Sequence, residues 1–195
     1  MGRKISFDYD RALDAATLLF WKNGYAETAL RDLLEAMEIG EGSFYNTLKS
    51  KKNLYLLCLQ RYQEKELHAR VHALASAPTA ALGIRAFFGR ILDRLDNPNS
   101  PSRLCMFAAM AEEEVLAEPD LRKRAEKGLD DVRTLFLARL THDRDEGVLA
   151  PSLNPPVVAA VITTYLQGLW RMALVGYDRG GFEQQIETFL SGMGL

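Results

Sequence analysis

The segment from Thr28 to Leu54, TALRDLLEAMEIGEGSFYNTLKSKKNL, constrains the fold of this chain more than any other part of the sequence. Behind a possible N-cap at Thr28, a first helix is predicted by apolar residues at helical spacing: Leu30, Leu33, Leu34 and Met37. Gly40 can begin a second helix after a tight turn, where Phe44 and Leu48 would face back toward the first helix. The segment therefore predicts two short helices joined by a tight turn.

The opposite face of the second helix is polar and aromatic, with Ser43, Tyr45, Asn46 and Thr47. A helix this short buries little surface of its own. Such a face is typical of the second helix of a helix-turn-helix, which contacts DNA bases. An ordinary surface helix between two packed helices would show the same pattern. These residues alone leave both interpretations open.

A wider pattern of residues at fixed offsets extends over Tyr9 to Leu57. Its members are Phe20, Gly24-Tyr25, Thr28, Leu30-Arg31-Asp32, Ile39, Gly42-Ser43-Phe44-Tyr45, Ser50-Lys51 and Leu54. With these residues the segment resembles the DNA-binding domain of TetR-family transcriptional repressors. The resemblance implies an all-α, cytoplasmic protein with a helix-turn-helix DNA-binding domain at residues 1–54 and a helical effector-binding and dimerisation domain at residues 55–195.

The same resemblance assigns roles to individual residues. The residues that it implies for contact with a double-stranded DNA operator are Thr28, Arg31, Ser43, Tyr45, Asn46, Thr47 and Lys51. Asn46 could pair with adenine through two hydrogen bonds, and Thr28, Tyr45 and Lys51 would meet phosphates.

The chain departs from the family pattern at two acidic residues. Glu38 stands at the turn position where the family usually has glycine, so we expect a positive φ there at a cost of about 1 kcal/mol. Glu41 replaces a residue that is often basic. A helical binding or scaffold protein without sequence-specific DNA binding therefore stays open as an alternative, and the operator sequence cannot be taken from a relative.

The net charge of −2 hides a local excess of positive charge. Between Ile39 and Arg61 the basic residues are Lys49, Lys51, Lys52 and Arg61, which against the single Glu41 leave a local charge of +3. We expect DNA phosphates to meet this basic patch rather than the protein as a whole. Met1 to Phe7, with Arg3 and Lys4, is expected to be a loose arm.

Helical spacing and turn residues predict about nine helices and no strands. The first runs from Asp8 to Asn23-Gly24, and the fourth begins at a Ser50 cap and continues to about Ala75. The later helices are expected at about Thr79–Leu95, Ser102–Leu116, Pro119–Glu146, Asn154–Tyr177 and Gly181–Met193.

Aromatic and sulfur-containing residues on these later helices could converge on an apolar pocket. The candidate ligand-binding residues are Phe87, Phe88, Ile91, Cys105, Met106, Met110, Phe136, Tyr165, Gln167, Trp170 and Arg171, of which Gln167 and Arg171 would orient the ligand. A plain core has the same composition. The family resemblance favours a pocket for a small, apolar effector that releases DNA.

The last two helices resemble the pair that forms a four-helix dimer interface in the family. Tyr165 to Trp170 lie on one, and the other carries Phe182, Ile186, Phe189 and Leu190. We therefore expect a homodimer, whose two DNA-binding domains would read both halves of a palindrome. An entirely intramolecular core is the alternative.

Other functional classes find little support in the sequence. It has no phosphate-binding glycine loop, nucleophile elbow or acid-base pair at a known spacing, so neither an enzyme nor a cofactor is expected. Glu112, Glu113 and Glu114 form a charge run that is typical of a solvated helix face. His68 and His72 could supply half of a metal site, but two exposed histidines need no ligand and we expect no metal.

The two cysteines, Cys58 and Cys105, predict a cytoplasmic protein with reduced thiols. The segment around Cys105 resembles one in which certain relatives sense electrophiles or oxidants, and nearby Arg103 would favour the thiolate. A buried, inert cysteine is the alternative. Arg171, near the middle of the apolar stretch from Val157 to Tyr177, argues against a membrane span.

Overall fold

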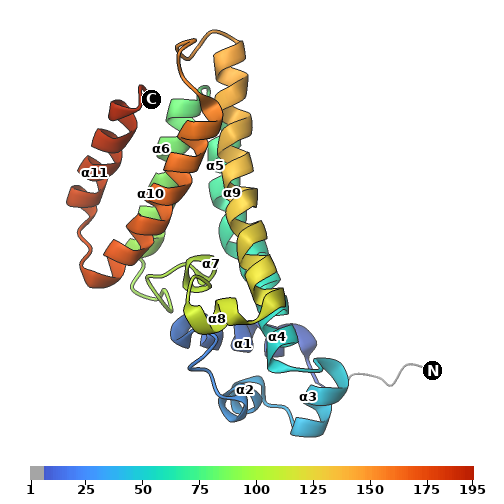
Figure 1. Cartoon of the computed structure of the whole chain (residues 1–195). Helices are drawn as coiled ribbons and strands as arrows, with labels where there is room; N and C mark the ends of the chain where they lie inside the picture. The colour runs from blue at the N-terminus through green and yellow to red at the C-terminus, as the bar shows by residue number, and fades with distance from the viewer. Residues whose placement is uncertain (1–6) are drawn as a thin grey trace. The chain divides into compact units, whose positions relative to one another are not determined.

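The computed structural model describes residues 7–195, which form two compact units. Unit 1 comprises the chain up to Lys65 together with Cys105–Ala125, and unit 2 comprises Glu66–Leu104 and Glu126–Leu195. No strand occurs within residues 7–195, which confirms the all-α prediction (Figure 1). The predicted arm at Met1–Phe7 lies almost entirely outside the described residues.

Helix α1, Tyr9–Asn23, begins and ends where the sequence predicts. The side chain of Asp8 accepts a hydrogen bond from the backbone N–H of Arg11 and so caps the helix. Gly24 ends it with a φ of 82°, a value that suits glycine because it has no Cβ. The apolar face of α1 packs on α4, where the ring centroid of Phe20 lies 4.9 Å from that of Tyr55.

Helices α2, Leu30–Met37, and α3, Glu41–Thr47, form the predicted pair. The N-cap of α2 is Ala29, without a side-chain hydrogen bond, so the predicted cap at Thr28 is wrong. The Thr28 hydroxyl is fully buried and donates instead to the carbonyl oxygen of Gly24 at 2.5 Å. Thr28 therefore satisfies an acceptor at the end of α1 rather than a donor at the start of α2.

The turn between α2 and α3 confirms the expectation at Glu38. This residue has a φ of 55° and a ψ of 40°, in the left-handed region where a side chain is disfavoured. Its carboxylate accepts a hydrogen bond from Arg11 Nη2 at 2.9 Å, and the two side chains are 68% and 71% exposed. Because both groups are well solvated, the pair offsets only a few tenths of a kcal/mol of the backbone cost.

Helix α4, Lys51–Tyr62, is capped by Ser50 as predicted, since its hydroxyl accepts the N–H of Asn53. The prediction of one uninterrupted helix to about Ala75 is wrong. A π-helical turn, η1, occupies Gln63–Leu67, and α5 follows at His68–Ser76. No proline or glycine lies in η1, so a helix breaker does not cause this change of hydrogen-bond register.

The single helix predicted at Ser102–Leu116 is also wrong. The structure has two short helices there, α7 at Met106–Ala109 and α8 at Glu113–Ala117. Met106, Met110 and Val115 are all buried, although in one continuous helix Val115 would lie on the face opposite Met106 and Met110. The break lets each short helix bury its own apolar side, which outweighs the helix propensity of the segment.

The remaining helices confirm the predicted positions to within about two residues. They are α6 at Ala80–Asp96, α9 at Pro119–Asp145, α10 at Pro155–Val175 and α11 at Arg179–Gly192. In unit 2, α5, α6, α10, α11 and α9 from residue 126 on run side by side (Figure 1).

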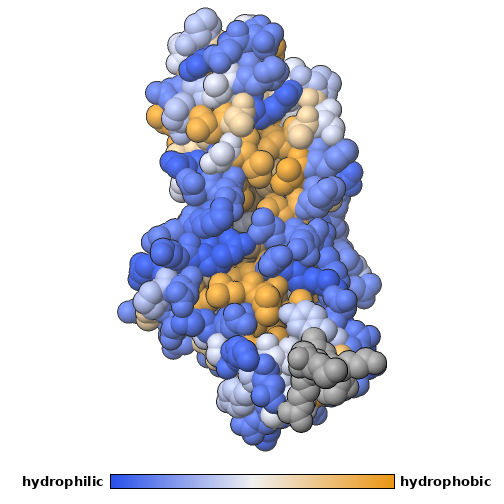
Figure 2. All heavy atoms as spheres, turned by 90° about the vertical axis from the view of Figure 1, so that its right-hand side faces the viewer, coloured by the Kyte–Doolittle hydropathy of each residue, from blue (hydrophilic) through white to orange (hydrophobic). Residues whose placement is uncertain are grey.

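Two contacts fix the position of α6 within unit 2. A Cβ placed on the buried Gly83 would lie only 2.5 Å from the backbone oxygen of Leu74 on α5, so the two helices approach as closely as glycine permits. At the N-terminus of α6, the buried carboxylate of Asp143 accepts the backbone N–H of Ala80 at 2.5 Å. The surface seen in Figure 2, from the right-hand side of Figure 1, is mainly hydrophilic with restricted apolar areas between the polar ones.

Candidate nucleic-acid interface and effector domain

Helix α3 presents a polar and aromatic face supported from behind by two buried residues. Phe44 and Leu48 are 0% and 1% exposed and anchor the helix in unit 1. On the other side, Tyr45 is 48% exposed, Asn46 is exposed, and Ser43 and Thr47 are half-buried. The structure thus brings four of the seven candidate DNA-binding residues onto one short helix. A fixed backbone with exposed hydrogen-bonding side chains is the arrangement that base recognition requires.

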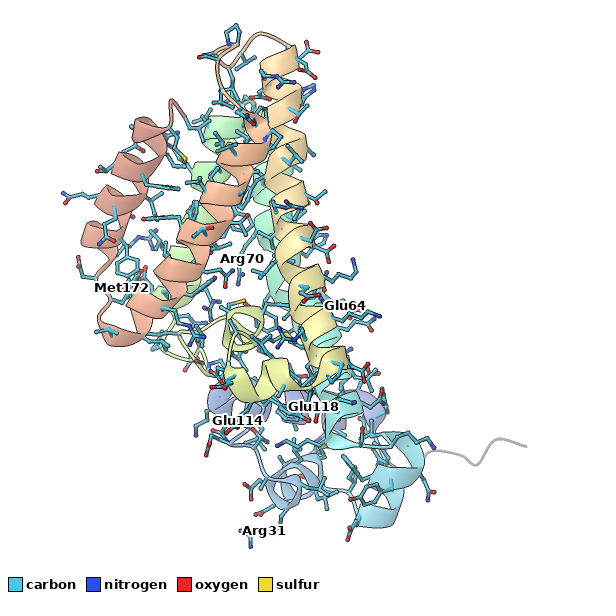
Figure 3. The ribbon with its side chains drawn as sticks, in the orientation of Figure 1. Arg31, Glu64, Arg70, Glu114, Glu118 and Met172 are labelled. Carbon is cyan, nitrogen blue, oxygen red and sulfur yellow. The ribbon has the colours of Figure 1, made fainter. Side chains whose placement is uncertain are left out.

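The other three candidates differ in their exposure. The side chain of Arg31 is 91% exposed and extends from α2 away from the ribbon (Figure 3). Thr28 is buried, so its hydroxyl is not available to a phosphate in this conformation. Lys51 is half-buried, and its ammonium donates to the backbone oxygen of Ala26 at 3.3 Å and lies 4.6 Å from the ring centroid of Tyr25. Burial lowers the pKa of Lys51.

Lys49 belongs to the predicted basic patch but was not among the seven candidate DNA-binding residues. It follows α3 with a φ of 70°, and its exposed ammonium donates to the backbone oxygen of Asn46 at 2.6 Å. A lysine just past the end of a helix commonly donates to the last carbonyls of that helix, so the position of Lys49 after α3 could have predicted this contact.

The basic patch presents less positive charge than the count along the sequence indicates. Lys52 Nζ lies 2.7 Å from Asp120 Oδ2 and 3.5 Å from Glu118 Oε2. The hydrogen bond with Lys52 holds the pKa of Asp120 below its usual value. Arg61 is likewise paired, with Asp14 at 2.8 Å and Asp10 at 3.2 Å. The local charge of +3 is therefore an overestimate, because acidic residues from elsewhere in unit 1 lie against two of its four cations.

An acidic hollow lies in the same unit. Its volume is about 330 Å³, and its lining consists of Asn23, Ala26, Glu27, Glu112, Glu113 and Glu114. The three consecutive glutamates are exposed, in keeping with the solvated face that their run predicts. Glu27 and Glu114 both act on Lys51, since their negative charges oppose the effect of burial on its pKa.

Part of the predicted effector site forms an aromatic cluster in unit 2. Phe87 contacts Phe136 edge to face with centroids 5.1 Å apart, and Phe88 contacts Tyr165 at 5.8 Å. These residues therefore converge, from α6, α9 and α10. Of the two residues expected to orient a ligand, Gln167 is half-buried and Arg171 is exposed. The candidates Cys105, Met106 and Met110 are buried in unit 1.

Two buried arginines that the sequence did not predict lie beside Trp170. The guanidinium carbons of Arg70 and Arg94 lie 5.5 Å and 4.5 Å from the ring centroid of Trp170, and both side chains are almost fully buried. Arg94 also donates to the backbone oxygens of Ser102 and Arg103, so it holds the loop after α6. Arg94 lies three residues after Ile91 on the apolar face of α6, a position where burial could have been foreseen.

Helices α10 and α11 carry an apolar surface. Tyr165 stacks on Phe189 with centroids 3.9 Å apart, beside a hollow of about 360 Å³ that Ala160, Val161 and Thr164 also line. The large apolar residues of α10 that remain exposed are Val157, Val161, Met172, Leu174 and Val175. By length and composition alone α10 could cross a membrane, but core helices of soluble proteins pass the same test and 39% of its apolar window is buried.

The thiols and the histidines form no evident reactive centre. Both cysteines are buried, and burial raises the pKa of Cys58 to about 12, which disfavours its thiolate. Within residues 7–195 no group of three or more His, Cys, Asp or Glu side chains could hold a metal ion.

The comparisons with known proteins agree with this geometry. Residues 12–58 match the model of bacterial regulatory proteins of the tetR family, and residues 81–189 match the tetracyclin repressor-like C-terminal domain. The chain is 28% identical over 192 residues to YezE of Bacillus subtilis (strain 168), an uncharacterized HTH-type transcriptional regulator, with 98% of each chain covered. Over 64 residues, 33% of this chain and 30% of the relative, it is 41% identical to the HTH-type transcriptional repressor ComR of Escherichia coli (strain K12).

Solved structures give the same answer. A cysteine mutant of the TetR family regulator CifR, complexed with 26 bp of double-strand operator DNA, superposes with a TM-score of 0.88 at 27% identity, over 98% of this chain and 100% of that one. Reduced NemR of E. coli, at 22% identity and a TM-score of 0.78, covers 94% of this chain and 93% of its own, and shares the fold.

Proposed function

The chain belongs to the TetR family of bacterial regulatory proteins, and from this premise we propose that it is a homodimeric, ligand-responsive repressor that a small apolar effector releases from a palindromic operator. As a member of this family it is a DNA-binding transcriptional regulator, which acts where the DNA is, in the cytoplasm. One observation supports DNA binding above all: the exposed face of α3 around Tyr45 and Asn46, held rigidly by the buried Phe44 and Leu48.

In this proposal α3 enters the major groove. Asn46 pairs with adenine, Ser43 and Thr47 contact neighbouring base edges, and Tyr45 meets the backbone. Arg31, with its exposed side chain, reaches a base or a phosphate from α2. Lys51 and Thr28 meet phosphates only if DNA draws Lys51 from the Tyr25 ring and Thr28 contributes its backbone N–H, because both side chains have partners within unit 1.

The partner that completes the operator-binding form is a second copy of the chain. The apolar surface of α10 and α11, with Val157, Val161 and the stacked pair Tyr165 and Phe189, is the surface that we assign to the dimer. A dimer doubles the number of base contacts and makes them two-fold symmetric, which a palindromic site requires. The complex of the relative CifR with operator DNA supports operator binding by this chain.

Release by an effector requires that the effector bind one conformation of the dimer more tightly than the other. We assign the binding site to the aromatic residues of unit 2 around Phe87, Phe88, Phe136 and Trp170. A helical scaffold protein that no longer reads DNA is the alternative function. The two acidic residues Glu38 and Glu41 beside the predicted groove-binding face are the observation that favours it.

Fluorescence anisotropy tests the proposal against the alternative. The purified protein is titrated with a labelled duplex from upstream of its own gene and with a scrambled duplex, at several salt concentrations. We expect tighter binding to the upstream duplex and affinity that falls steeply with salt, because phosphate contacts release counterions. Asn46→Ala should weaken specific binding about 10- to 100-fold, whereas Asn99→Ala, an exposed asparagine of unit 2, should not. If the wild type and both variants bound the two duplexes equally, the result would favour the alternative function, a scaffold protein without sequence-specific DNA binding.

A further inference from the structure

The strongest unassigned feature of unit 1 is a set of ion pairs at the start of α4. Lys52 lies in the first turn of this helix, within the basic patch, yet its ammonium is 2.7 Å from Asp120 and 3.5 Å from Glu118. The two acidic residues flank the junction of α8 and α9, where Figure 3 labels Glu118. All three side chains are only partly covered, so solvent and a competing ion can reach them.

The same acidic segment acts on the neighbouring lysine. The negative charges of Glu114, on α8, and Glu27 stabilise the ammonium of Lys51, which packs against Tyr25. Carboxylates are therefore paired with Lys52 and act through their charge on Lys51 in the free protein. A phosphate that approached Lys52 would compete with Glu118 and Asp120, because the like charges of phosphate and carboxylate repel each other at one ammonium.

We propose that the acidic junction formed by Glu118 and Asp120 is an autoinhibitory contact, which competes with operator phosphates for Lys52 and sets the affinity of the regulator for DNA. This inference rests on the proposed function, since it assumes that the start of α4 faces DNA. Binding exchanges the Lys52–Asp120 pair for a Lys52–phosphate pair. The junction thereby lowers affinity for every duplex, and it does so without a contribution to base recognition.

The position of the junction in the chain gives it a regulatory use. Helix α9 begins in unit 1 at Pro119 and continues into unit 2 from Glu126, so Asp120 lies on a helix that both units share. A change in unit 2 that shifts this helix along its axis would strengthen or break the pair with Lys52. The effector state of unit 2 can in this way alter the charge that unit 1 offers to DNA.

The experiment compares the double variant Glu118→Gln, Asp120→Asn with the wild type by anisotropy on the upstream and scrambled duplexes. At low salt the variant should bind both duplexes about two- to five-fold more tightly, since an exposed ion pair no longer has to be broken. The slope of log affinity against log salt should stay close to the wild-type slope, because Lys52 neutralises one phosphate in both complexes. Single Asp120→Asn should show most of the effect, and thermal melts check that each variant is folded.

Two controls separate local competition from a general change of charge. Asp131→Asn removes a half-buried carboxylate of α9 that is paired with Lys127 at 2.8 Å, and it should leave DNA binding unchanged. The double variant is also made in a Lys52→Gln background, where its gain should disappear if Lys52 is the group released.

A gain that persists with Lys52→Gln, an equal gain from Asp131→Asn, or no gain at all would overturn the autoinhibitory contact. If the wild type bound both duplexes equally, the proposed function alone would be contradicted. The effect of the junction on affinity could still be measured with the scrambled duplex. No binding of either duplex by any variant at low salt would overturn both.

Discussion

Gly83→Ala is the substitution whose effect the structure fixes most closely. The new Cβ would lie 2.5 Å from the backbone oxygen of Leu74, whereas carbon-oxygen contacts of this kind lie at about 3.3 Å or more, so the helices must separate by about 0.8 Å. The obstacle is backbone of α5 and cannot rotate away, which places the overpacking cost near the upper end of the usual range, about 3 kcal/mol. Alanine regains about 1 kcal/mol of helix propensity. We therefore expect a net loss of about 2 kcal/mol.

Gly89 supplies a matched control on the same helix. A Cβ there meets nothing within 4 Å, so Gly89→Ala should gain the helix propensity without the clash, about 0.5 to 1 kcal/mol. Urea unfolding followed by circular dichroism gives both values, and the melting temperature of Gly83→Ala should fall by about 4 to 8 °C. Protein concentration is held constant because a dimer makes stability depend on it. Equal or higher stability of Gly83→Ala, with Gly89→Ala also stabilised, would refute the reasoning.

Two further substitutions test other contacts of unit 2. Asp143→Ala leaves the buried N–H of Ala80 without its acceptor and should lower the free energy of unfolding in urea by about 2 to 4 kcal/mol. As a control, His142→Ala at the adjacent, exposed position should change it by less than about 0.5 kcal/mol. Equal effects of the two substitutions would contradict the capping role of Asp143. Glu187, paired with Arg85 at 2.7 Å, has its pKa lowered to about 2 from 4.5, so its stabilisation is present above about pH 4.5 and lost as pH falls toward 2. Glu187→Gln should reduce the loss of stability over that range, and an unchanged pH profile would show that the pair contributes nothing.

Local signals in the sequence predicted most helix boundaries correctly. The caps at Asp8 and Ser50 and the left-handed turns at Gly24 and Glu38 depend on residues within three or four positions, so the sequence contains the whole interaction. Thr28 shows the limit of such signals. Its hydroxyl had two candidate partners nearby, the start of α2 and the end of α1, and spacing could not decide between them.

Features that depend on distant contacts were missed. The π-helical turn at Gln63–Leu67 and the break between α7 and α8 occur in segments of good helix-forming residues, where tertiary packing overrides propensity. The neutralisation of Lys52 belongs to the same class, since its partner Asp120 lies 68 residues away along the chain. A charge count over one segment cannot contain that pairing.

The candidate sites were predicted unevenly for the same reason. The outer face of α3 follows from helical periodicity alone once Phe44 and Leu48 are known to be buried. The sequence predicts the candidate effector-binding residues only in part, because the composition of a pocket does not differ from that of a core. Arg70 and Arg94 were missed since a charged residue is seldom expected to pack against a buried tryptophan.

The burial of the two cysteines has a practical consequence. Cys58 and Cys105 are the only thiols in the sequence, and both belong to unit 1. A thiol reagent can modify them only when that unit opens, so the rate of labelling at low denaturant reports the free energy of local opening, as amide hydrogen exchange does. Unit 2 contains no thiol and therefore contributes no labelling signal in the same measurement. The protein thus carries an intrinsic probe that follows the opening of one unit, and DNA that stabilises this unit would slow its labelling without any engineered label.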